Sequence, residues 1–186
     1  MLSQAENGEL TDWGWDTATD NTKKAAFAET YILPYFNVVK NCKFGANKGC
    51  FASGNAQYLK TGNGNNYDAS TSYYKFTTAD GMSWGIYYDG SSCVTNKKLC
   101  ATIYVDTNGK KPPYTWGIDV FAFQLFPITN EILPCGVYKY NVAYDETKKE
   151  YTRYTQSDIN SNCSKTGYGD YCAAKVVQDG FKINYL

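Results

Sequence analysis

The chain of 186 residues contains no histidine and no Cys-x-x-Cys pair. Without an imidazole, Ser-His and Cys-His catalysis are excluded, because both need a histidine to take the proton of the nucleophile. Most of the usual Cys and His ligand sets for zinc are excluded as well. A phosphate-binding loop is missing as well, since Gly62-Asn63-Gly64 is followed by neither further patterned glycines nor a Lys-Ser/Thr pair. These absences argue against the common classes of catalytic site.

The chain has no excess of either charge. Eighteen Lys and Arg balance eighteen Asp and Glu, and the formal net charge is zero. The lysine pairs at positions 23–24, 97–98 and 110–111 are scattered along the chain and form no basic stretch. A nucleic-acid surface needs clustered positive charge to displace counterions. The sequence therefore predicts solvated surface lysines and no nucleic-acid partner.

Cysteine is plentiful, with seven residues in the chain. Six of them form three pairs, each of which brackets a short polar loop that could bring the two sulfur atoms together. Disulfides place the protein in an oxidising compartment, outside the cytoplasm. Cys135 is left over, and its partner cannot be read from the sequence. The predicted disulfides are Cys42–Cys50, Cys93–Cys100 and Cys163–Cys172.

Long apolar runs are also absent, so the chain shows neither a signal peptide nor a membrane span. Its first residues, MLSQAENGELTDW, are polar from the third position onward. An exported protein needs such a segment. We therefore expect the export segment to lie upstream of Met1, with residues 1–9 continuing from a helix there.

Alternation of apolar and polar residues predicts strands over residues 72–78, 83–89, 101–106 and 119–126. Their short connections favour an antiparallel meander. Asp20 is a plausible N-cap for a helix over residues 23–32, and Pro34 should end that helix or begin a second short one over residues 35–39. In the tail we expect a hairpin from residues 137–144 and 150–154, a helix capped by Asp170, and a last strand over 181–185. No linker or repeat interrupts the chain, which predicts one domain over residues 1–186.

The chain resembles bacterial type IV pilins and type II secretion pseudopilins, the proteins with a prepilin-type cleavage and methylation segment. The resemblance is carried, in order, by AENGELTDWGWD, YILPYFNVVKNC, YYKFTTADGMSWGIYYDG, IYVDTNGKKPPYTWGIDVFAFQLF, ILPCG and YGDYCAAKVVQDGFKINY. Its most specific part is residues 106–121, which are similar to the family's D-x-N-G-x-K-G-P-x-x-x-G-x-D-x-F segment. Two residues depart from the family pattern: Pro112 stands where Gly is more usual, and Cys135 replaces an aromatic residue.

The resemblance implies an α+β fold, in which a long N-terminal helix packs on an antiparallel sheet and a disulfide-tied region follows. It implies a structural subunit of a type IV pilus or a type II secretion-like filament, and not an enzyme. Its partners would be other pilin or pseudopilin subunits, and the membrane through an apolar helix that precedes this segment. The implied location is the cell envelope, a pilus or the extracellular surface.

Two alternatives come from particular residues. Asp106, Asn108 and Asp119 flank a loop rich in Gly and Pro, and oxygen ligands on a tight turn can hold calcium, as in some pseudopilins. These three residues could equally serve a structural turn by binding backbone amides. Asp80, Asp89, Asp106 and Asp119 flank strands, where paired carboxylates could catalyse glycoside hydrolysis. Asp at strand ends is more typical of a residue that binds its own backbone.

Aromatic residues suggest a second class of function. The chain has 18 Tyr and 4 Trp among many Asn and Gly residues. Exposed aromatic faces would suit a glycan, so the alternative to a filament subunit is a secreted adhesin or carbohydrate-binding module. The competing interpretation is that Trp84, Trp116 and most tyrosines belong to the sheet and the core.

Overall fold

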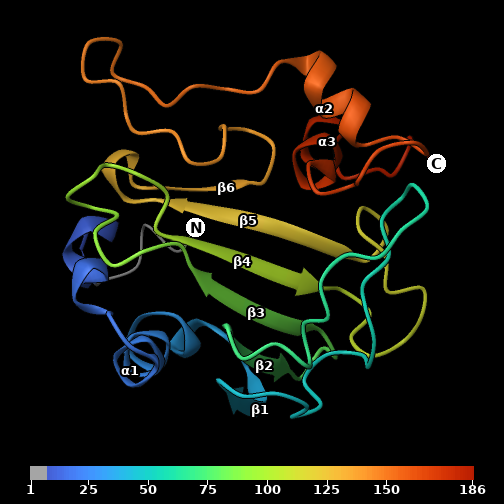
Figure 1. Cartoon of the computed structure of the whole chain (residues 1–186), viewed down its shortest axis with the longest axis horizontal. Helices are drawn as coiled ribbons and strands as arrows, with labels where there is room; N and C mark the ends of the chain where they lie inside the picture. The colour runs from blue at the N-terminus through green and yellow to red at the C-terminus, as the bar shows by residue number, and fades with distance from the viewer. Residues whose placement is uncertain (1–7) are drawn as a thin grey trace.

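The computed structural model describes residues 8–186 and consists mainly of one six-stranded antiparallel sheet (Figure 1). The strands follow one another in the sheet in the order in which they occur in the chain, as expected for a meander. The four strands that alternation predicted are confirmed to within one residue at each end. The strands are β1 (Val38–Lys43), β2 (Tyr73–Thr78), β3 (Ser83–Tyr88), β4 (Ala101–Asp106), β5 (Val120–Phe126) and β6 (Glu131–Pro134).

The two faces of the sheet carry different clusters of side chains. Ile86, Ile103 and Leu125 lie on what we call the first face, together with Tyr74 and Phe76. On the second face, Tyr73 and Ala122 join a separate cluster that contains Tyr67 and Trp116 from the loops. The pairing of Ile86 with Ile103 and of Tyr104 with Ala122 keeps residues of one face opposite one another. Since both faces are covered, the interior strands are buried on both sides.

The N-terminal part of the described chain packs against the first face. It contains two 3-10 turns, η2 (Leu10–Trp13) and η3 (Trp15–Thr17), followed by helix α1 (Asn21–Tyr31). Asp20 caps α1 as expected, since its carboxylate accepts a hydrogen bond of 2.9 Å from Lys23 N. Trp15 and Phe27 pack with ring centroids 4.2 Å apart, and both contact the ring of Tyr88 at the end of β3. Large aromatic side chains thus contribute much of the volume of this core.

The predicted α+β pilin-like head, with a long N-terminal helix packed on the sheet, is wrong. The structure is mostly sheet with a few short helices, and α1 is only 11 residues long. Gly14, in the left-handed conformation with φ 74°, separates the two 3-10 turns, so no continuous helix runs from residue 10 into α1. The expected continuation of an upstream helix into residues 1–9 falls almost entirely outside the described residues.

Of the two outcomes expected at Pro34, the end of the first helix is confirmed, because α1 stops at Tyr31, and the second short helix over residues 35–39 does not form. Pro34 lies within a 3-10 turn, η4 (Leu33–Tyr35), and the chain then enters β1. Val38 pairs with Thr78 of β2, and two register shifts along this pairing bend β1. Only Cys42 of β1 is buried. Because an exposed edge strand with bulges lacks regular alternation, its sequence gave no period-two signal.

Below the second face, Lys75 of β2 is completely buried. Its ammonium group donates to four backbone carbonyls, those of Gly45 (2.6 Å), Tyr67 (3.1 Å), Asp68 (2.8 Å) and Ser70 (2.8 Å). Burial lowers the pKa of Lys75, and the negative charge of Asp68 acts against this shift. The lysine therefore holds the irregular connection between β1 and β2 against the sheet.

The C-terminal part differs from its prediction in four places. Helix α2 (Gln156–Asn162), which was not predicted, begins with a capping box between Thr155 and Asp158. Helix α3 (Cys172–Gln178) is the predicted tail helix, but its N-cap is Tyr171 and not Asp170. The last strand is wrong, since residues 181–186 form none and Phe181 is 79% exposed. The predicted hairpin is reduced to the isolated bridges Tyr138–Arg153 and Asp145–Glu150.

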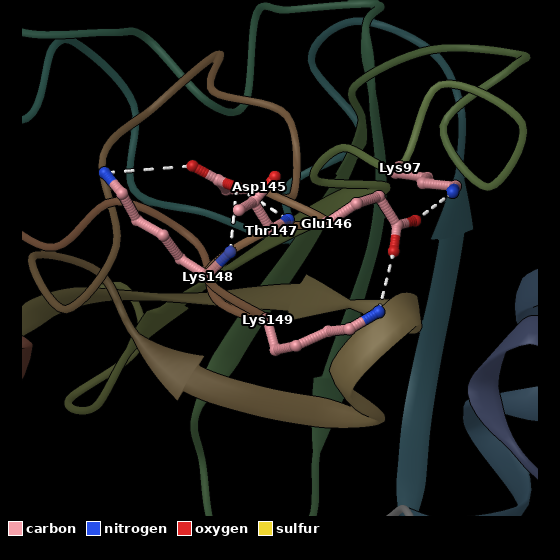
Figure 2. Close-up of polar contacts among 6 residues, drawn as sticks. All are labelled: Lys97, Asp145, Glu146, Thr147, Lys148 and Lys149. Carbon is pink, nitrogen blue, oxygen red and sulfur yellow. Dashed lines mark hydrogen bonds and ion pairs between the residues drawn. The ribbon is translucent and has the colours of Figure 1, made fainter.

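Residues 137–155 form what we call the C-terminal excursion, and a tight turn at residues 145–149 connects it with the loop of the second disulfide (Figure 2). Asp145 accepts hydrogen bonds from the backbone N–H groups of Thr147 (2.9 Å) and Lys148 (3.0 Å). Glu146 pairs with Lys97 and with Lys149. The ion pairs link the turn to the disulfide loop. Because these side chains are well exposed, the ion pairs contribute little to stability.

Candidate functional site

The structure forms the three predicted disulfides. The Cα atoms lie 6.2 Å apart in Cys42–Cys50, 5.0 Å in Cys93–Cys100 and 5.0 Å in Cys163–Cys172. Three disulfides in one chain indicate an oxidising, extracytoplasmic environment. Cys135 has no disulfide partner among residues 8–186. Its pKa is raised by burial and by the nearby negative charge of Asp170, so its thiol stays protonated.

The candidate calcium residues lie together at the loop between β4 and β5. Asp119 accepts hydrogen bonds from Asn108 Nδ2 (2.8 Å), Tyr114 N (2.7 Å) and Thr115 N (2.5 Å). Asp106 accepts one from Asn108 N at 3.2 Å. These bonds are those of the structural turn, in which carboxylates bind backbone amides.

Some oxygen atoms of this turn have no partner. Asp106 Oδ2, Asn108 Oδ1 and Ser83 Oγ are buried without a hydrogen bond. Burial and the charge of Asp119 raise the pKa of Asp106 to about 7. Within residues 8–186, no three His, Cys, Asp or Glu side chains gather in a way that could hold a metal ion. Calcium needs six to eight oxygen ligands. Calcium binding at Asp106, Asn108 and Asp119 therefore stays an alternative to the structural turn.

The other carboxylates at strand ends also have internal partners. Asp80 accepts hydrogen bonds from the Thr78 hydroxyl (2.5 Å) and from Met82 N (3.2 Å). Asp89 accepts one from the Thr102 hydroxyl at 3.0 Å and another from the Tyr140 hydroxyl. Burial raises the pKa of Asp89 to about 6. These contacts suit residues that shape turns and join segments.

A cavity of about 340 Å³ lies on the second face. Its floor is made by residues of β4 and β5 that share this face, with Thr102 opposite Gln124 and Tyr104 opposite Ala122. Its walls come from the connection between β1 and β2, the loop between β4 and β5, and the C-terminal region. The wall residues are Tyr58, Asn65, Trp116, Cys135, Tyr140, Tyr154, Asp170 and Tyr171.

Aromatic rings pack against one another in pairs around this cavity. Trp116 and Tyr104 have ring centroids 5.9 Å apart at an angle of 82°. Tyr154 and Tyr171 pack at 4.4 Å, and the Tyr171 hydroxyl donates a 2.6 Å hydrogen bond to the Tyr154 hydroxyl. Asp170 receives a 2.6 Å hydrogen bond from Asn162 Nδ2, and burial raises its pKa. An aromatic enclosure with a few polar groups is typical of a small-molecule site.

Sequence reasoning did not find this cavity, because its lining residues come from segments far apart in the chain. It expected Trp116 to be a core residue. Trp116 is indeed buried, and its side chain also lines the cavity. Asp170 was assigned to capping α3, and the structure places it in the cavity wall instead. The only signal in the sequence is composition, the many tyrosines among Asn and Gly residues.

Every helix among the described residues is too short or too polar to cross a membrane. Comparison with protein-family models, with curated proteins and with solved structures found no match for this chain.

Proposed function

We propose that this protein is a structural subunit, a pilin or pseudopilin, of a type IV pilus or a type II secretion-like filament. The observation that carries the proposal is the ordered set of sequence segments similar to that family, with residues 106–121 as its most specific part. The role is proposed for the domain as the structure has it, a disulfide-tied antiparallel sheet without a long N-terminal helix.

The compartment supports this role. Each disulfide closes a loop of seven to nine residues in sequence separation. Thiols are kept reduced in the cytosol, whereas such bonds persist in exported proteins. A filament subunit outside the cell would occupy such an oxidising environment.

The place of residues 106–121 in the fold also supports a structural role. They leave the sheet at the end of β4 and return to it at the start of β5, so they connect two neighbouring interior strands. Asp119 fixes the loop by accepting three hydrogen bonds, two of them from backbone N–H groups. Residues 106–121 therefore help to shape the domain, and their similarity to the family supports a structural role rather than a catalytic one.

The test follows the native protein in its own cells. Antibodies against residues 8–186 would be used on sheared surface filaments and on isolated envelopes, by immunoblot and immunogold microscopy. We expect the antigen in the filament or envelope fraction, and its loss from the filament fraction when the prepilin peptidase is deleted. An exported protein independent of that peptidase serves as the control.

Two results would contradict the proposal. One is antigen that stays in the surface or culture fraction at the same level after deletion of the peptidase. The other is a native gene whose product has no apolar helix ahead of this domain. In either case a secreted adhesin or carbohydrate-binding module becomes the better assignment.

A further inference from the structure

We propose that the cavity on the second face is a binding site for a neutral sugar ring. This inference goes beyond the filament role and is independent of it, because a subunit can bind a glycan whether or not it assembles. Four features of the cavity support it: aromatic walls, one buried polar group of the floor without a partner, a lining without Lys or Arg, and walls bonded to one another.

The walls offer aromatic faces and edges. Trp116 and Tyr104 stand nearly perpendicular to one another beside the floor, and the pair Tyr154–Tyr171 lies on the C-terminal side. One face of a pyranose ring carries C–H groups and packs well on an aromatic ring, while its hydroxyls point outward to polar partners. The volume of about 340 Å³ falls at the lower end of the range for small-molecule sites.

The floor supplies a polar group that lacks a partner. Gln124 is only 1% exposed, and its Oε1 accepts no hydrogen bond. An apolar ligand would leave this buried carbonyl unpaired, which is unfavourable. A hydroxyl group of a ligand would satisfy it. Thr102, directly opposite Gln124 on β4, adds a hydroxyl to the same part of the floor.

Charge restricts the class of ligand. Asp170 is the one carboxylate of the lining, and no Lys or Arg is among the lining residues. Without a cation, a phosphate, sulfate or carboxylate would meet only the negative charge of Asp170. A neutral polyol needs no counter-charge, and the free lone pairs of Asp170 can accept its hydroxyl donors. A quaternary ammonium ion would use the aromatic walls but could not donate a hydrogen bond to Gln124.

The walls are bonded to one another, so the cavity does not depend on a ligand to form. Trp116 N donates to Gln57 O at 2.9 Å, and Lys60 N donates to Gly167 O at 2.8 Å. Gly136 lets the wall close tightly, since a Cβ there would lie 2.7 Å from Tyr171 Cβ. The disulfide Cys163–Cys172 joins α2 to α3 directly after Tyr171. A preformed site loses little freedom on binding, which favours affinity.

The experiment uses the folded chain and two kinds of probe. A printed array of neutral glycans identifies candidates, and saturation-transfer NMR with glucose, galactose, N-acetylglucosamine and their β-1,4-linked disaccharides at about 10 mM detects weak binding. Glucose 6-phosphate, sialic acid and choline are the charged comparisons. We expect saturable binding of at least one neutral sugar and none of the charged compounds.

Two variants and two matched controls locate the site. Gln124→Met keeps the length of the side chain and removes its polar groups, and Trp116→Phe removes part of a wall. Each should weaken binding at least about tenfold. Gln156→Met on the exposed surface and Trp84→Phe on the first face should leave binding unchanged. Thermal unfolding checks that every variant folds. If Trp116→Phe fails to fold, the binding of Gln124→Met alone tests the site.

The proposal is overturned by any of three results with folded protein. The first is no saturable binding of a neutral sugar in either assay. The second is binding of choline or of an anion in its place. The third is sugar binding that Gln124→Met and Trp116→Phe leave intact. None of these results touches the filament proposal, which is tested by the location of the protein in cells.

Discussion

Lys75 is the residue whose role depends most on the structure. A lysine in the strand YYKFTT would ordinarily point to solvent, but here its ammonium group is enclosed by four carbonyls of the connection between β1 and β2. Removing this charge would leave the four carbonyls without their shared donor. Buried charged hydrogen bonds of this kind are costly to break from one side.

We expect Lys75→Met to lower the free energy of unfolding by about 3–5 kcal/mol. Urea denaturation measures this loss, and hydrogen exchange should show faster exchange over residues 44–70. Lys40→Met is the matched control. Lys40 also donates to carbonyls of this connection, Lys48 O at 2.6 Å and Gly49 O at 3.4 Å, but it is exposed. Its loss should cost less than about 1 kcal/mol. Equal losses of unfolding free energy for the two variants would contradict a special role for the four carbonyls around Lys75.

The turn at Asp106, Asn108 and Asp119 gives a second prediction at this scale. Asn108 turns its NH₂ group toward Asp119, so its oxygen faces away from that carboxylate. Asp119 already accepts three hydrogen bonds. We therefore expect the melting temperature to be the same with EDTA and with millimolar calcium. A rise with calcium that Asp106→Asn abolishes would show instead that the turn is a calcium site.

At the scale of elements, Asp89 joins the end of β3 to the C-terminal excursion through Tyr140. Burial raises the pKa of Asp89 from 3.8 to about 6, against the lowering effect of its bonds with the hydroxyls of Tyr140 and Thr102. Between these two values the folded protein binds more protons than the unfolded chain. Stability should therefore fall as the pH rises through this window and level off above it.

The measurement is thermal unfolding between pH 5 and pH 8. We expect a higher melting temperature at pH 5 than at pH 8, and a smaller difference for Asp89→Asn. Part of the difference should persist in this variant, because the pKa of Asp106 is also raised, to about 7. A melting temperature that rises toward pH 8 in the wild-type protein would contradict this assignment.

The disulfide between α2 and α3 should matter for both stability and the cavity. Its sequence separation is nine residues, so replacing both cysteines by serine should cost about 2–3 kcal/mol in chain entropy. Because Cys172 follows Tyr171 directly, sugar binding should weaken as well. The control is the Cys93–Cys100 pair, which belongs to the cluster on the first face and should cost similar stability with binding retained. Equal sugar binding by both double variants would show that the Cys163–Cys172 disulfide does not support the binding site.

For the whole molecule, the sequence predicted the central strands, the meander and the three disulfides. These features leave local signals: alternation in β2 to β5 and short polar loops between cysteines. It failed where the signal is not local. β6 is a strand of four half-buried residues, and β1 is exposed over most of its length. The cavity was hidden for the same reason, since Gln124 becomes a candidate only when Trp116 and Tyr171 are seen around it.

The edges of the sheet determine how the isolated domain behaves. An open edge strand is a template for pairing with another chain, unless bulges or charged side chains block it. β1 has two register shifts in its pairing with β2, and its exposed residues include Lys40 and Lys43. Beyond β6, the chain continues into the excursion of residues 137–155, which lies on that side of the sheet (Figure 1). Neither edge strand is therefore well placed to pair with a strand of another chain.

We therefore expect residues 1–186 to be a monomer of 20.8 kDa in solution, with assembly requiring the apolar helix expected upstream. Sedimentation equilibrium over a hundredfold range of concentration measures the mass of the isolated domain. Expression of the full gene with its prepilin peptidase and assembly machinery then tests filament formation, and the same gene without the peptidase is the control. A domain that forms dimers or filaments on its own would show that the sheet edges, and not an upstream helix, carry the assembly.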